Sequence, residues 1–123
     1  MEICEFKIAK KLKEKGFREP CLLYYNSDKV RIWFKEPWIA KNFTPTTLGN
    51  DDVLAPTISQ VLKWLREKDI MVEIPIDLGD NGIWQFTFRI QTKEFYERAT
   101  KCDYVSYESA ALSCIEYVID NLI

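Results

Sequence analysis

The feature that most constrains the fold is a pair of alternating apolar runs on either side of a glycine-rich loop. The apolar positions of these runs are Ile70, Val72, Ile74, Ile76, Trp84, Phe86, Phe88 and Ile90. The loop Gly79-Asp80-Asn81-Gly82 between them is typical of a β-hairpin turn. Because successive side chains of a strand point to opposite faces, the alternation predicts a hairpin with one covered and one wet face. Pro75 has no N–H group to donate, which predicts that the first strand lies partly at a sheet edge.

Two shorter runs, Leu22–Tyr25 and Val30–Phe34, flank a turn-forming sequence at 26–29 and predict a second hairpin. The apolar positions of the later run, which we expect to share the buried face, are Val30, Ile32 and Phe34. That expectation places Arg31, Trp33 and Lys35 on the face away from the helices. An exposed tryptophan there is expected to contact either the 36–56 segment or a partner.

Three further segments have apolar residues at helical spacing. In the first, Ile3, Phe6, Ala9 and Leu12 recur at that spacing, and Gly16 follows as a residue that ends the helix with positive φ. The second begins at Thr57, with Gln60 three residues later in a capping box, and the last begins at Ser106. The expected buried stripe of the last helix is Ala111, Cys114, Ile115, Val118 and Leu122. The resulting order of elements is α-β-β-α-β-β-α.

These elements predict an α+β fold. We expect a mostly antiparallel sheet of about four strands in two hairpins, with three helices packed mainly on one face. A chain of 123 residues with 47% hydrophobic residues has enough apolar surface for one core, so residues 1–123 are predicted to form a single domain. Residues 36–56 contain three prolines and are predicted to be an irregular segment that is either functional or tied down by its own apolar side chains, of which we favour the second.

The N-terminal sequence is charged throughout and has no apolar stretch of the kind found in signal peptides. No apolar run approaches the roughly 20 residues that cross a bilayer. We therefore expect a cytoplasmic protein with no membrane partner.

Residue types that catalysis commonly requires are missing. The chain has no histidine, which excludes Ser–His and Cys–His pairs, and its four glycines are too dispersed for a phosphate-binding loop. The four cysteines form no C-x-x-C pair, and we interpret them as reduced structural thiols rather than zinc ligands. Carboxylates and asparagines gather at 50–52 and 77–81, where turn formation explains them. Neither a metal nor a cofactor is expected, and an enzyme is the least expected class.

Binding is the remaining class, and two kinds of partner are open. Residues 1–42 carry ten Lys/Arg against six Asp/Glu, whereas residues 43–123 carry seven against thirteen. An aromatic side chain between cations can hold single-stranded nucleic acid, whereas the sequence pI of about 5.2 argues against it. We therefore expect a small binding or accessory module for a protein partner or a second copy, with single-stranded nucleic acid bound by the basic first helix and Trp33 as the alternative. The candidate binding residues are Lys10, Lys11, Arg31, Trp33, Lys35 and Trp38.

Several short stretches together resemble small uncharacterised proteins of gut Bacteroidales genomes, often from phage-like or mobile regions. These stretches, which span most of the chain, are 16–17, 20–21, 55–57, 63–66, 72–74, 106–111 and 121–123. They consist of helix caps and apolar stripes rather than chemical motifs. The resemblance implies a bacterial or phage cytoplasmic protein and brings no activity with it.

The cysteine pattern gives a first prediction: Cys4, Cys21, Cys102 and Cys114 are all unpaired. Thiol titration of the denatured, unreduced protein should find four free thiols, because cytosolic proteins keep their cysteines reduced. Two free thiols, or none, would contradict the cytoplasmic assignment.

Overall fold

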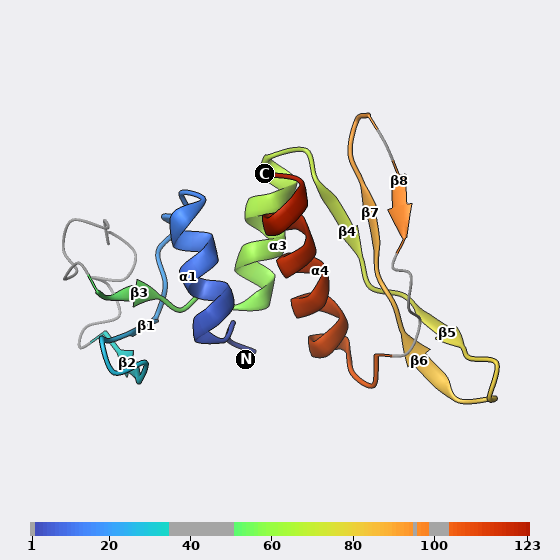
Figure 1. Cartoon of the computed structure of the whole chain (residues 1–123), viewed down its shortest axis with the longest axis horizontal. Helices are drawn as coiled ribbons and strands as arrows, with labels where there is room; N and C mark the ends of the chain where they lie inside the picture. The colour runs from blue at the N-terminus through green and yellow to red at the C-terminus, as the bar shows by residue number, and fades with distance from the viewer. Residues whose placement is uncertain (1, 35–50, 95, 99–103) are drawn as a thin grey trace. The chain divides into compact units, whose positions relative to one another are not determined.

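The computed structural model describes residues 2–34, 51–94, 96–98 and 104–123. It divides the chain into two compact units, Met1–Gln60 and Val61–Ile123, with the boundary inside helix α3 (Ile58–Glu67). The described residues form three helices and several short antiparallel strands, which confirms the predicted α+β class and, roughly, the predicted order of elements (Figure 1). The strands are divided among small sheets instead of forming one sheet of about four. That the chain is one domain stays a prediction.

The N-terminal unit contains a three-stranded sheet covered by helix α1 (Phe6–Glu14). Its strands, in the order β2-β1-β3, are β1 (Leu23–Tyr25), β2 (Arg31–Trp33) and β3 (Val53–Leu54). The predicted turn joins β1 to β2: the Asn26 side chain accepts the N–H groups of Asp28 and Val30, and Lys29 takes a positive φ of 63°. A core cluster of this unit contains Ala9, Leu23, Tyr25, Val53 and Ala55, with Ile3 and Phe6 packed against it.

Strand β3 corrects the prediction that 36–56 is irregular throughout. Val53 and Leu54 pair with Tyr25 and Tyr24 of β1, and both are buried. Their burial confirms, for this end of the segment, that its own apolar side chains tie it down. Residues 35–50 lie outside the described residues.

Helix α1 (Phe6–Glu14) starts later than the apolar spacing predicts. Residues 2–5 are extended instead, because their backbone pairs with the stretch before α3: the Cys4 N–H donates to the Pro56 carbonyl, and the Ile58 N–H donates to the Glu2 carbonyl. Cys4 therefore lies outside the helix, although it is buried. The helix ends as predicted, with Gly16 at φ 89° and the Phe17 N–H donating to Leu12.

Helix α3 (Ile58–Glu67) begins with the predicted capping box. The Gln60 N–H donates to Thr57 Oγ1 at 3.1 Å, and the Thr57 N–H donates to Gln60 Oε1 at 2.9 Å. The Gln60 amide also donates to the Pro20 carbonyl at 2.7 Å. One glutamine thus fixes both the start of the helix and the chain segment that precedes β1.

The C-terminal unit holds the long hairpin, which is interrupted once. Its strands are β4 (Met71–Glu73), β5 (Ile76–Leu78), β6 (Trp84–Phe86), β7 (Arg89–Gln91) and β8 (Tyr96–Arg98). The pairs Val72↔Ile90 and Ile76↔Phe86 belong to one continuous register. Between them, the Thr87 N–H donates to the Pro75 carbonyl, and proline has no N–H to return. The ladder therefore separates into β4-β7-β8 and β5-β6.

Helix α4 (Tyr107–Asn121) completes this unit and starts at the predicted cap. The Ser106 side chain accepts the Ser109 N–H at 3.1 Å, and Ser109 closes the capping box. Its buried residues are Ala110, Ala111, Cys114, Ile115, Val118 and Ile119. Leu122 follows the helix as its C-cap and is half-buried, so the predicted stripe is correct except at its last position.

The second prediction tests the cap of α3. Thr57→Ala removes the hydroxyl that accepts the Gln60 N–H, and it should lower the free energy of unfolding by about 0.5–2 kcal/mol in urea denaturation. Ser59→Ala, at an exposed position in the first turn, is the matched control and should change stability by less than about 0.5 kcal/mol. An unchanged urea midpoint for Thr57→Ala would show that this cap does not hold the helix.

Candidate functional site

The apolar face of the long hairpin changes from buried to exposed along its length. Ile90 is 0% exposed and Phe88 is 7% exposed, whereas Trp84, on the same face, is 69% exposed. On the other arm, Ile76 is 52% and Leu78 is 59% exposed. We call Ile76, Leu78 and Trp84 the distal apolar face.

Register explains why these side chains lie together. Leu78 is directly opposite Trp84, and Ile76 is opposite Phe86, so the four side chains share one face. Asp77 and Gln85 form the pair between them and lie on the reverse face. Ile83, beside the turn, is a further exposed apolar residue at 58%.

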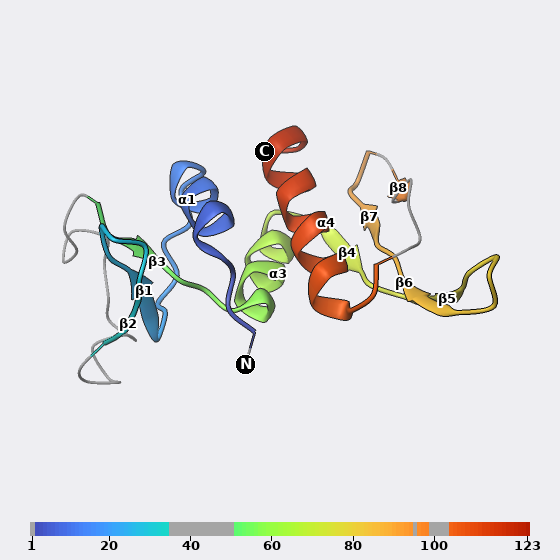
Figure 2. The ribbon, with the colours of Figure 1, turned by 60° about the horizontal axis from the view of Figure 1, so that its bottom comes forward.

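The position of α4 explains the change in exposure. The Tyr117 ring of α4 lies 6.4 Å from the Phe88 ring, so the helix packs on the proximal part of the hairpin. In the first turn of α4, the Tyr107 ring lies 6.5 Å from the Phe86 ring, and the contact between the helix and the hairpin ends there. Beyond that point β5 and β6 extend away from α4, as both views show (Figures 1 and 2).

The two edges of the distal hairpin differ. Along β6, Phe86 and Tyr104 exchange two backbone hydrogen bonds, at 2.9 and 3.2 Å, so this edge is partly occupied. Along β5, the part of the chain that the structure describes supplies no strand other than β6. Asp77, at the centre of β5, places a carboxylate on that short edge strand, which is a common device against edge pairing.

In the N-terminal unit, the predicted binding residues lie on the opposite face of the sheet from the one expected. Trp33 is opposite Leu23, and Arg31 is opposite Tyr25. Leu23 and Tyr25 pack against α1 in the core, so Arg31 and Trp33 share the face that α1 covers. The prediction that Val30, Ile32 and Phe34 take the buried face against the helices is therefore wrong.

The alternation of residue types in β2 does not show which face of the sheet meets α1, because β2 has apolar side chains on both faces. The half-buried residues of the second face of this sheet are Tyr24, Ile32 and Phe34. The rings of Tyr24 and Phe34 lie 5.0 Å apart there, which confirms that these two share a face. Strand β1, not β2, settles which face meets α1.

Several aromatic and basic side chains converge on the α1 side of this sheet. Arg31 Nε donates to the Tyr25 hydroxyl at 3.0 Å, and that hydroxyl donates to the Cys4 carbonyl. The Tyr25 ring meets Phe6 edge-on at 5.5 Å, and Lys29 Nζ lies 5.3 Å from the centre of the Phe6 ring. Trp33, 61% exposed, extends the same face. We call this set, with Lys10, the basic–aromatic face: Phe6, Lys10, Tyr25, Lys29, Arg31 and Trp33.

Lys10 joins this face through a hollow of about 480 Å³. The hollow is lined by Phe6, Lys10, Lys13, Glu14, Ser27, Asp51 and Val53, so Lys11 takes no part in it. Glu14 and Asp51 oppose the lysine charges, and Lys13 Nζ already donates to the Asp52 carbonyl at 3.0 Å. Of the other predicted binding residues, Lys35 and Trp38 lie outside the described residues.

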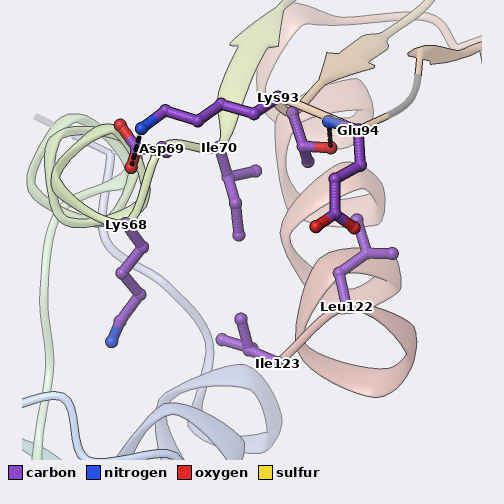
Figure 3. Close-up of a pocket in the computed structure, with 8 residues that line it drawn as sticks. Lys68, Asp69, Ile70, Lys93, Glu94, Leu122 and Ile123 are labelled. Atoms are coloured by element: carbon purple, nitrogen blue, oxygen red, sulfur yellow. Dashed lines mark hydrogen bonds and ion pairs between the residues drawn. The ribbon is translucent and has the colours of Figure 1, made fainter.

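A second hollow, of about 300 Å³, lies in the C-terminal unit where α3 and α4 end (Figure 3). Lys93 Nζ is 3.3 Å from the Asp69 carboxylate, and the Glu94 N–H donates to Thr92 Oγ1. Asp69 takes a positive φ of 62° where α3 ends. The charges in this hollow are exposed and balance one another, so it offers less for binding than the hairpin.

Three of the four thiols are buried and unpaired. Burial raises the pKa of Cys4, Cys21 and Cys114 to about 12. At neutral pH these thiols are protonated, and a thiol without its thiolate form is a poor nucleophile. Their role is packing, as the sequence predicts, while Cys102 lies outside the described residues.

Comparison of the chain with protein-family models, curated proteins and solved structures found no match. None of the helices described here has the length and apolar character needed to cross a membrane. Function is therefore inferred from the chain's own surfaces. Among the described residues, the distal apolar face differs most from an ordinary surface, because its three large apolar side chains are each more than half exposed. The sequence pattern identified its residues, but it assigned them to the core.

Proposed function

We propose that this chain is a protein-binding module whose docking surface is the distal apolar face of the β5-β6 hairpin. The observation that carries the proposal is that Ile76, Leu78 and Trp84 share one face while each is more than half exposed. A small soluble domain seldom leaves three large apolar side chains together in water without an interaction to cover them.

The physical argument has two parts. Covering apolar surface stabilises a complex by about 25 cal/mol per Å², so a buried tryptophan alone can contribute several kcal/mol to binding. An isolated two-stranded hairpin is also only marginally stable in water. A partner on the distal apolar face would supply the layer that α4 supplies to Phe88 and Ile90.

The third prediction concerns ligand selection. Peptides selected from a random displayed library on the wild-type protein should require the distal apolar face. Their binding should fall about 30-fold or more in Trp84→Ser, because an aromatic anchor at an interface centre typically contributes about 2 kcal/mol or more. Leu78→Ser is the second test variant, and binding is measured by fluorescence anisotropy of the labelled peptides.

Trp33→Ser is the matched control, since Trp33 is 61% exposed in the other unit. It should leave peptide binding unchanged, and urea denaturation should show that all variants fold. A library that yields no ligands, or ligands that bind equally well to Trp84→Ser and Leu78→Ser, would refute this proposal.

A second candidate function, binding of single-stranded nucleic acid, is supported by the basic–aromatic face. Trp33 offers an exposed ring for stacking, and Arg31 lies on the same face two residues earlier. Lys29 and Lys10 add positive charge around the Phe6 ring. Glu14 and Asp51 beside Lys10 oppose that charge, which is why this function ranks second.

The fourth prediction tests this candidate with a fluorescein-labelled 15-nucleotide deoxythymidine strand. Trp33→Ala should weaken binding about tenfold, because stacking of one base contributes about 1–3 kcal/mol. Affinity should also fall as salt rises, through release of counterions. Trp84→Ala serves as the control and should bind normally. Affinity that depends on neither Trp33 nor salt would exclude the candidate.

A further inference from the structure

We infer that the partner of the distal apolar face is a short amphipathic segment of another protein that carries lysine or arginine beside its apolar side chains. The inference rests on the proposed function and adds the chemistry of the ligand. It follows from the area of the face, from the charge of the unit that bears it, and from the state of the hairpin edges.

Area favours a short segment. Its three side chains, each more than half exposed, present an apolar patch on the order of several hundred Å². A stable homodimer usually buries about 1,000 Å² or more on each subunit. The distal apolar face is too small for that, whereas it matches the few anchor side chains of a bound peptide segment.

Charge favours a basic ligand over a second copy. Residues 75–87, which form the distal hairpin, contain Asp77 and Asp80 and no lysine or arginine. The whole C-terminal unit, 61–123, carries eleven Asp/Glu against seven Lys/Arg. Two copies docked through this hairpin would bring like net charges together, whereas a basic segment would be attracted.

The two hairpin edges disfavour pairing with a strand of a second copy. This leaves the distal apolar face as the docking surface. If two β5 strands paired about a two-fold axis, with Ile76 opposite the Leu78 of the other copy, Asp77 would lie directly opposite its own counterpart. Like charges in directly opposed positions destabilise a sheet. The β6 edge is partly occupied by Tyr104. What remains open is the uncharged face of Ile76, Leu78 and Trp84.

The fifth prediction uses synthetic 18-residue peptides and the full chain. A helical leucine–lysine peptide with one apolar face should bind the wild type, and Trp84→Ser should weaken its binding about 30-fold. The double variant Asp77→Asn/Asp80→Asn removes two negative charges from the reverse face and the turn, so it should weaken binding only about twofold, through the net charge of the hairpin and not through a direct charge pair. The controls are a scrambled leucine–lysine peptide and a leucine–glutamate peptide of the same pattern, which should both bind at least tenfold more weakly.

Three results would overturn the inference. The first is a leucine–lysine peptide that does not bind, or that binds Trp84→Ser equally well. The second is a leucine–glutamate peptide that binds as tightly. The third is self-association of the wild type by light scattering that Trp84→Ser abolishes, since a second copy would then occupy the face. Library ligands that require Trp84 but lack basic residues would overturn the ligand chemistry and leave the proposed function standing.

Discussion

The continuous register of the 70–91 hairpin is the constraint on which the rest of the C-terminal unit depends. Because Val72 pairs with Ile90 and Ile76 with Phe86, the alternating apolar residues of both arms share one face, whereas Met71 and Ile83 lie on the other. Pro75 interrupts the hydrogen bonds but leaves the register unchanged. The hairpin is therefore one ribbon with a single apolar face, of which α4 packs on the part around Phe88 and Ile90. The proposed docking surface is the remainder of that apolar face.

Much of the local structure follows from single residues, and these parts are predictable. Thr57 and Ser106 cap their helices, Gly16 ends α1, and Asn26 holds its turn, each through an interaction within a few residues. Long-range pairing is what the sequence could not supply. The Ile3 spacing is helical, yet residues 2–5 are extended because their backbone hydrogen bonds go to Pro56 and Ile58. Tertiary pairing overrode a local pattern there.

The same distinction applies to the candidate sites. Trp33 was expected on the face away from the helices, but the side of the sheet on which it lies depends on Leu23 and Tyr25 of the neighbouring strand. The sequence pattern assigned the distal apolar face to the core. Alternation shows which residues share a face, but it does not show whether another element covers that face. The lengths of the two elements differ: a strand over residues 70–78 extends about 30 Å, whereas the 15 residues of α4 extend about 22 Å. A helix of that length leaves part of the strand uncovered.

The construction of the hairpin also bears on how tightly it can bind. The β5-β6 ribbon is held by its own ladder and by the bridge at Tyr104, whereas β4 and β7 lie in a three-stranded sheet. Local opening requires less free energy where fewer apolar contacts are buried, so β5-β6 should open before β4-β7. A ligand that orders this ribbon must offset that loss of conformational freedom. A small apolar face on a marginal ribbon therefore suits a reversible contact. In the proposed complex, basic residues of the ligand would add rate and selectivity, and Trp84 would supply most of the affinity.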